Sequence, residues 1–254
     1  MAKYEIPNLT NACRVLKSLA GEPEGLLLRE LVQCLDLPHT SALRIVNTLC
    51  AAGFLQRTGN RYGLGVGLIP LGQQALARLD IRAVARPVLK ALSEQTVETA
   101  HLAILSGSRS LLVEVAQSPS PIRVGAPAGT QVELHCSATG KIFLAGLPDG
   151  RLGPLLGPGP FKSHTPNTLN MLQKLRAGLR RIRSQGYAVD DEELFLGIRC
   201  LAAAVRNAEG EVVAAVGITG ATTRFTAARI PSVSRQVMAA AAAVSRGLGY
   251  AAGG

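Results

Sequence analysis

The chain has 254 residues, of which 47% are hydrophobic and 17% charged, a composition that excludes a wholly disordered protein. No apolar run reaches the roughly 18 residues of a membrane span, and residues 1–7 lack the apolar core of a signal peptide, so we expect a cytoplasmic protein with no membrane partner. The 27 basic and 17 acidic residues give a net charge of +10, which favours a polyanionic partner such as nucleic acid.

Three helices and a hairpin are predicted in residues 1–68. Apolar residues at three- and four-residue spacing predict helices over 9–20 and 28–35, and a third from Pro38 to Ala52. The second and third helices, joined by a tight turn at 36–38, form a helix-turn-helix. Residues 55–64 contain a Gly59-Asn60 turn that predicts a hairpin, so the whole segment is predicted to be a winged helix.

The third helix is predicted to carry a polar face without acids. No Asp or Glu occurs between Leu37 and Leu79, and in a winged helix the third helix enters the major groove while basic wing residues meet phosphates. Arg44 is the first choice for a base contact. A small bundle that binds only protein is the alternative, which the acid-free face disfavours. The predicted DNA contacts are Thr40, Ser41, Arg44, Asn47, Arg57 and Arg61.

The remaining residues predict an α+β domain, an antiparallel sheet covered by helices. A linker helix is predicted over 69–79, and residues 152–160, rich in Gly and Pro, predict a surface loop. The acidic run 190–193 is, taken alone, typical of a solvated turn or a helix N-terminus. Further helices are predicted over 82–95, 134–147, 169–185 and 226–248, and strands over 100–105, 111–116, 201–205 and 212–218.

Motifs for catalysis or metal binding are weak. There is no nucleophile elbow, Walker loop or dinucleotide-binding glycine pattern, and the four histidines lack paired zinc-ligand spacing, so neither a cofactor nor a metal is expected. The five cysteines lie far apart without a C-x-x-C pair. A cysteine-dependent small-molecule enzyme is the competing hypothesis, with Cys136 beside His135, or Cys200, as the nucleophile, but proximity in sequence does not establish an activated thiolate.

Several motifs, in the right order, resemble the IclR family of bacterial transcriptional regulators. The N-terminal ones fall in the predicted helix-turn-helix and wing, and the C-terminal ones in the predicted α+β domain. They are LPHTSALR at 37–44, AGFL at 52–55, RYGLG at 61–65, LHCSATGK at 134–141, GYAVDDEE at 186–193 and GIRCLAA at 197–203.

The resemblance implies an α+β protein with three parts: a winged helix-turn-helix DNA-binding domain over 1–68, a linker helix over 69–79, and a GAF-like effector-binding and oligomerisation domain over 80–254. It implies a regulator rather than an enzyme. Such a regulator binds double-stranded promoter DNA as a homodimer or homotetramer. It responds to a small organic acid, commonly a carboxylic acid, aromatic ones included, from a catabolic pathway.

The resemblance also implies an effector site in the C-terminal domain. Gly217 departs from the family pattern, because relatives often have Ser there, and its missing hydroxyl leaves one hydrogen bond to the ligand absent or replaced by water. Independently, N–H groups that open the predicted helix at 138–139 can receive a carboxylate. Ordinary core packing is the alternative for each residue. The implied effector contacts are Ala138, Thr139, Asp190, Ile198, Cys200 and Thr219.

Overall fold

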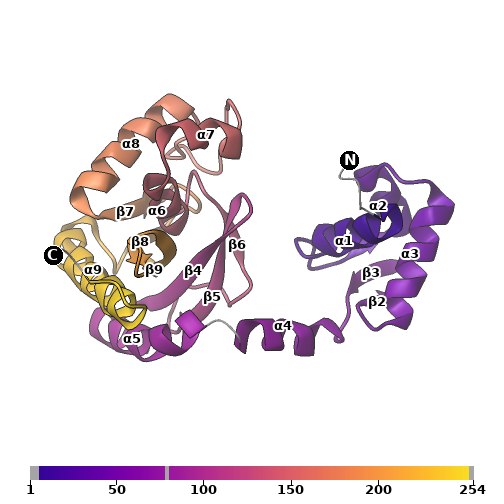
Figure 1. The fold of residues 1–254 in the computed structure, drawn as a ribbon, viewed down its shortest axis with the longest axis horizontal. Helices are drawn as coiled ribbons and strands as arrows, with labels where there is room; N and C mark the ends of the chain where they lie inside the picture. The colour runs from indigo at the N-terminus through magenta and orange to yellow at the C-terminus, as the bar shows by residue number, and fades with distance from the viewer. Residues whose placement is uncertain (1–5, 78–79, 252–254) are drawn as a thin grey trace. The chain divides into compact units, whose positions relative to one another are not determined.

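The computed structural model describes residues 6–77 and 80–251. The chain divides into two compact units, Met1–Arg78 and Leu79–Gly254 (Figure 1). Each unit has its own hydrophobic core. The last two residues of the predicted linker helix, 78 and 79, lie outside the described residues, as do residues 1–5 and 252–254 of the two predicted domains. Among the helices described, none is long and apolar enough to cross a membrane.

Unit 1 is the predicted winged helix. Its three strands form an antiparallel sheet in the order β1-β3-β2, and Val15, Leu31, Val46 and Tyr62 are buried in its core. The two-residue strand β1 was not predicted, because it is too short to show an alternating pattern. The elements are α1 (Pro7–Leu19), β1 (Leu26–Leu27), α2 (Leu28–Leu35), α3 (His39–Ala51), β2 (Leu55–Thr58), β3 (Arg61–Leu64) and α4 (Leu68–Ala77).

Local contacts explain where the two helices of the helix-turn-helix begin and end. The Glu30 carboxylate accepts a hydrogen bond from the Leu27 N–H at 2.8 Å, which satisfies a donor at the start of α2. Asp36 ends α2 in the left-handed conformation, with φ of 51°, and donates its N–H to the Val32 carbonyl. Pro38 then precedes α3 as its N-cap, one position earlier than the predicted first turn.

Unit 2 is built on one six-stranded sheet in the order β6-β5-β4-β9-β8-β7, in which all neighbouring strands are antiparallel. Helices α5 and α9 pack against each other and against one face, and α6 packs between the sheet and α8 (Figure 1). This confirms the predicted α+β class. The elements are α5 (Asp80–Thr96), β4 (Thr99–Ser106), β5 (Arg109–Ala116), β6 (Gln131–Glu133), α6 (Ala138–Gly146), α7 (Asp149–Leu156), α8 (Leu172–Gln185), β7 (Tyr187–Asp191), β8 (Ile198–Arg206), β9 (Val212–Ala221), a 3₁₀ turn (Ala227–Arg229) and α9 (Ile230–Gly247).

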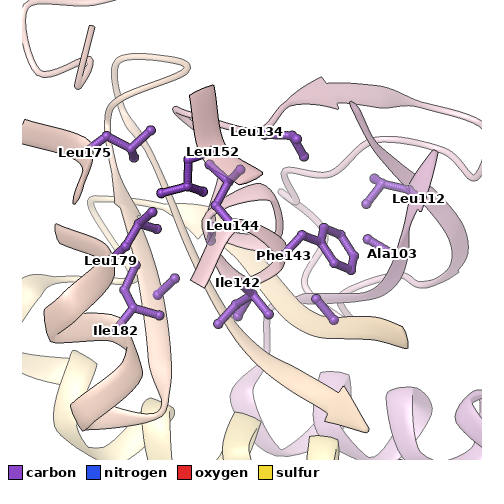
Figure 2. Close-up of a cluster of buried hydrophobic side chains, with 14 residues drawn as sticks. Ala103, Leu112, Leu134, Ile142, Phe143, Leu144, Leu152, Leu175, Leu179 and Ile182 are labelled. Carbon is purple, nitrogen blue, oxygen red and sulfur yellow. The ribbon is translucent and has the colours of Figure 1, made fainter. Parts of the chain in front are cut away.

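The core on the α6 side of the sheet joins α6, α7 and α8 to the strands (Figure 2). All residues of α6 from Ala138 to Leu144 are buried, which is why this helix shows no polar face in the sequence. The predicted surface loop over 152–160 is wrong in its first half. Residues 149–156 form α7, because Leu152 is fully buried and this packing outweighs the poor helix propensity of Gly153 and Pro154.

Gly140 allows α6 to start directly against the end of β6. A Cβ at this position would lie 2.4 Å from the Leu134 Cα and 2.6 Å from its carbonyl oxygen, both of which are backbone atoms. Ser137 precedes the helix and accepts the Gly140 N–H at 3.2 Å. The position of the α6 N-terminus therefore depends on a residue without a side chain.

Gly140→Ala is expected to lower the free energy of unfolding by about 1–3 kcal/mol, because the backbone must move to admit the methyl group. The matched control is Gly178→Ala in α8, where the nearest atom to the new Cβ is a Leu169 methyl at 3.8 Å. That substitution is expected to stabilise by up to about 1 kcal/mol, since Ala is the better helix former. Urea denaturation measures the free energy of unfolding of both variants. Equal changes in the two variants would show that Gly140 is not needed for the close packing of α6.

Candidate functional site

A cavity of about 130 Å³ lies among the N-terminus of α6, strands β4 to β9 and the segment that follows β7; we call it the α6 cavity. Its wall is mostly apolar, with a few inward-facing polar groups, as is typical of small-molecule sites. The structure brings all six predicted effector residues together here, from four separate elements. They are Ala138, Thr139, Asp190, Ile198, Cys200 and Thr219, and their role in binding stays a prediction.

The N-terminus of α6 supplies positive electrostatic potential to the cavity. The first N–H groups of a helix have no intrahelical partner, and Ala138 and Thr139 occupy these positions in the cavity wall. The Thr139 hydroxyl is already paired with Ser110 at 2.8 Å. The backbone N–H groups, rather than this hydroxyl, are thus the groups suited to an anion.

His101 is a polar cavity residue that sequence reasoning missed. It lies opposite Gly217 in the β4–β9 pairing, and a Cβ at Gly217 would lie only 2.7 Å from the His101 Nε2. The imidazole thus occupies the space that a Ser side chain would take. The expected loss of one hydrogen bond to the ligand stays a prediction. Burial lowers the pKa of His101 to about 4, so the ring is neutral at pH 7.

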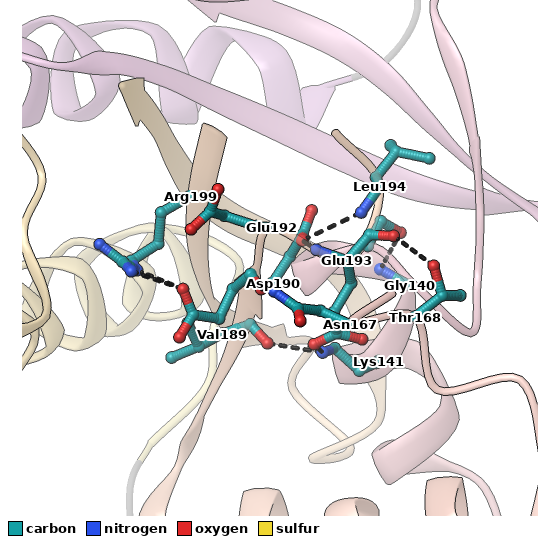
Figure 3. A network of polar contacts seen from close by, with 12 residues as sticks. Gly140, Lys141, Asn167, Thr168, Val189, Asp190, Glu192, Glu193, Leu194 and Arg199 are labelled. Carbon is teal, nitrogen blue, oxygen red and sulfur yellow. Dashed lines mark hydrogen bonds and ion pairs between the residues drawn. The ribbon is translucent and has the colours of Figure 1, made fainter. Parts of the chain in front are cut away.

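Asp190 and Glu193 belong to a buried polar network around Lys141 (Figure 3). The Lys141 ammonium donates to the Val189 carbonyl at 2.5 Å and to the Glu193 carboxylate. The Asp190 Oδ1 accepts the N–H groups of Glu193 at 2.8 Å and Leu194 at 3.4 Å. These bonds close the turn after β7 and place Leu194 in the cavity wall.

The acidic run is therefore not the solvated turn that its composition alone indicates. Asp190 and Glu193 are 2% and 7% exposed, and Asp191 pairs with Arg199 at 2.5 Å. Burial raises the pKa of Asp190 to about 6, although the Lys141 ammonium opposes this shift. Burial also raises the pKa of Glu193, and Lys141 again opposes it.

The thiols near the cavity are poor candidates for catalysis. Burial, followed by the charge of Glu133, raises the pKa of Cys136 to about 12. Burial also raises the pKa of Cys200, whose sulfur lies 3.3 Å from the Thr219 hydroxyl. Because a nucleophilic cysteine needs a lowered pKa, neither thiol is activated as the competing enzyme hypothesis requires.

Side chains that could hold a metal gather outside the lining of this cavity. They come from the end of β6 and from a segment far along the chain, so the sequence shows no paired spacing between them. The group consists of Glu133, His135, Cys136 and His164.

The predicted DNA contacts fall into two groups in unit 1. On α3, Thr40, Arg44 and Asn47 are exposed, and Ser41 is half-buried beside a groove between α1 and α3. The spacing of these four residues places them on one face of α3.

The two wing arginines are bound by groups of their own unit. Arg57 donates to the Gly59 carbonyl at 2.8 Å and lies over the Tyr62 ring, 5.7 Å from its centroid. Arg61 donates to the Gly25 carbonyl at 2.8 Å and lies 3.7 Å from the Glu30 carboxylate. Since Glu30 partly offsets its charge, Arg61 is the weaker of the two phosphate candidates.

Family models match both halves of the chain. The model described as "IclR helix-turn-helix domain" matches residues 8–59, and that described as "Bacterial transcriptional regulator IclR C-terminal" matches residues 73–246. The transcriptional repressor IclR of Escherichia coli strain K12 is 30% identical over 252 residues, which cover 98% of this chain and 92% of that protein. The transcriptional repressor AllR of Salmonella typhi is 33% identical over 217 residues, covering 85% of this chain and 80% of that protein.

Solved structures are similar over both units. The crystal structure of IclR from Thermotoga maritima is 30% identical, with a TM-score of 0.71, and the match covers 97% of this chain and 100% of that one. The two relatives from Escherichia coli and Salmonella typhi are named as transcriptional repressors, not as enzymes.

The buried Asp190 predicts a defined pH dependence of stability. Its native pKa of about 6 lies above its ordinary value of 3.8, so the native state binds more protons than the unfolded chain between these values. The stability that this group contributes is therefore lost as the pH rises through that window. Asn does not titrate and can still accept both N–H groups through its carbonyl oxygen.

We expect Asp190→Asn to gain stability relative to the parent by up to about 3 kcal/mol between pH 4 and pH 6. Denaturation curves of both proteins at several pH values measure this difference. Parallel stability profiles would show that Asp190 titrates alike in the native and unfolded states.

Proposed function

The chain belongs to the IclR family of bacterial transcriptional regulators, and on this premise we propose which residues read DNA and which bind the effector. It is a DNA-binding regulator with a C-terminal effector domain. We assign DNA recognition to α3 and the wing of unit 1. We assign effector binding to the α6 cavity of unit 2.

The exposed face of α3 supports its role in the major groove. Arg44 projects from this face, and arginine pairs with guanine through two hydrogen bonds. Thr40, Ser41 and Asn47 add neutral hydrogen-bonding groups beside it, and the absence of acids from Leu37 to Leu79 avoids repulsion of phosphates. Arg57, which packs on its own hairpin, is placed to meet a phosphate without first losing side-chain freedom.

The observation that supports the effector assignment is that the six residues implied by the family resemblance all line one small cavity. The cavity volume lies below the roughly 300–1,000 Å³ of drug-sized pockets, which favours an acid of few carbon atoms. Among the described residues, the lining contains no lysine or arginine. A carboxylate must therefore rely on the N–H groups of α6, on hydroxyl groups such as that of Thr219, and on protonated partners.

In this proposal Asp190 and His101 become those protonated partners when the ligand binds. A bound carboxylate would raise the pKa of both groups, since negative charge favours their protonated forms. Asp190 would then donate a hydrogen bond to the ligand instead of repelling it. We infer that binding takes up protons near neutral pH and is tighter below pH 6.

We further propose that the protein acts in the cytoplasm as a homodimer or a homotetramer. Exposed apolar side chains around the start of α4, those of Val66, Ile69 and Leu71, support a self-association surface in unit 1. In this proposal α4 acts as the linker that couples the units. The effector changes DNA affinity only by binding two oligomer arrangements unequally.

Arg44→Ala is expected to weaken binding to the operator by about 5- to 150-fold, the 1–3 kcal/mol of a lost bidentate base contact, and to relax preference at one base pair. Gel shifts with footprinted promoter DNA and single-base variants measure both effects. The control is Arg176→Ala, which removes an equal charge from an exposed position on α8 of unit 2. If the Arg44 variant keeps both its affinity and its preference, the assignment of Arg44 is wrong.

Thr219→Val is expected to weaken effector binding by about 10-fold or more, because it removes a hydroxyl that can bond to a charged ligand while keeping the side-chain volume. Calorimetry with a panel of short carboxylic acids, in buffers of different ionisation enthalpy, measures affinity and proton uptake together. Thr223→Val, at an exposed position four residues later, is the matched control. If every acid that binds has the same affinity for the Thr219→Val variant as for the parent, the effector site lies elsewhere.

A further inference from the structure

Four metal-ligating side chains converge beside the start of α6. One potential ligand atom from each lies within 4.8 Å of all the others, although the residues come from two segments of the chain. We propose that this cluster, called the four-ligand cluster, binds one divalent transition-metal ion, and that zinc is its favoured occupant. Its members are Glu133, His135, Cys136 and His164.

The donor set selects the class of metal. Two imidazole nitrogens, one thiolate and one carboxylate oxygen make a four-coordinate N/S/O set, which zinc takes in a tetrahedron with bonds of about 2.0–2.3 Å. Mg²⁺ and Ca²⁺ require mostly oxygen ligands, so the thiol and imidazoles exclude them. Ligand atoms in such a tetrahedron lie about 3.3–3.8 Å apart, so contraction around the ion by about 1 Å completes the site.

Hydrogen bonds around the cluster orient both imidazoles. The His135 Nε2 lies 2.9 Å from the Lys162 carbonyl, and since a carbonyl only accepts, this nitrogen carries the proton and Nδ1 keeps its lone pair. This is the arrangement of metal-bound histidines, whose second nitrogen donates to an outer carbonyl or carboxylate. The His164 ring stacks on the His135 ring at 6.4 Å between centroids, and its Nε2 contacts the Glu133 Oε2.

The charges of the cluster match a doubly charged cation. Glu133 and a deprotonated Cys136 supply two negative charges, and the sulfur lies 3.9 Å from the Glu133 Oε2. The neighbouring cation, Arg109, lies 3.8 Å from the other oxygen, Oε1, which leaves Oε2 facing the ligand group. His135 and Cys136 are buried, so a bound ion would be held away from bulk water.

A metal here would cross-link two segments beside the α6 cavity, although none of the four ligand residues lines it. His164 precedes Thr165 and Thr168, whose hydroxyls donate to the carbonyls of Glu192 and Glu193, both at 2.6 Å. On the other side, Cys136 directly precedes Ser137, the N-cap of α6. Occupancy would therefore hold the β6–α6 junction against the turn that follows β7.

The test uses the whole chain, stripped of metal with a chelator and titrated with Co²⁺ and then with Zn²⁺. We expect one ion per chain, with the thiolate-to-cobalt charge-transfer band and the intense visible bands of a four-coordinate site. Cys136→Ser should lose the charge-transfer band. His164→Gln should bind zinc more than about 100-fold more weakly, since loss of a ligand costs more than the 10- to 100-fold effect of a lost supporting residue.

Cys34→Ser and His39→Gln, at exposed positions of unit 1, are matched controls that should bind as the parent does. Circular dichroism of each apo variant shows whether it is folded. The parent spectrum tests the proposal even if a variant unfolds. A folded parent without the thiolate-to-cobalt band, or folded cluster variants with the parent's zinc affinity, would overturn the proposal, whatever the outcome of the DNA and carboxylic-acid experiments.

Discussion

The ammonium group of Lys141 is a buried charge, and the arrangement of the candidate site in unit 2 depends on its partners. An unpaired ammonium in this core would cost several kcal/mol, so α6 cannot leave the end of β7 without losing the Val189 carbonyl and the Glu193 carboxylate. The same contacts hold the turn that Asp190 closes. One ion pair thus fixes the α6 N-terminus and the segment opposite it, which are two walls of the cavity.

The net charge of +10 has two different origins in the two units. Residues 1–68 carry 7 basic and 5 acidic side chains, a net charge of only +2. The feature of unit 1 that indicates DNA binding is therefore the absence of acids from Leu37 to Leu79, rather than the net charge. In unit 2 several arginines bind the protein itself: Arg183 donates to the Ala145 and Leu147 carbonyls, and Arg224 pairs with the fully buried Glu98 at 2.6 Å. These arginines therefore stabilise tertiary structure and need no polyanionic partner.

The sequence predicted the winged helix and the antiparallel sheet because their apolar periodicities are long enough to recognise. Strands β6 and β7 were not predicted, because they are short and lie at the two edges of the sheet. Helix α7 was not predicted either, because it depends on the burial of Leu152. Motif resemblance supplied six residues that meet at one cavity. It could not supply His101, which is placed by strand register opposite Gly217, nor the contact of His164 with Glu133, which joins distant segments.

Regulation by this protein depends, in our proposal, on a small acid that binds in the α6 cavity. Hydrogen–deuterium exchange of the whole chain, with and without the tightest-binding short carboxylic acid, measures where the acid binds. We expect the acid to slow exchange in residues 137–141, 190–195 and 217–220. Slowing confined to the open groove between α5 and α9, with these three segments unchanged, would contradict it.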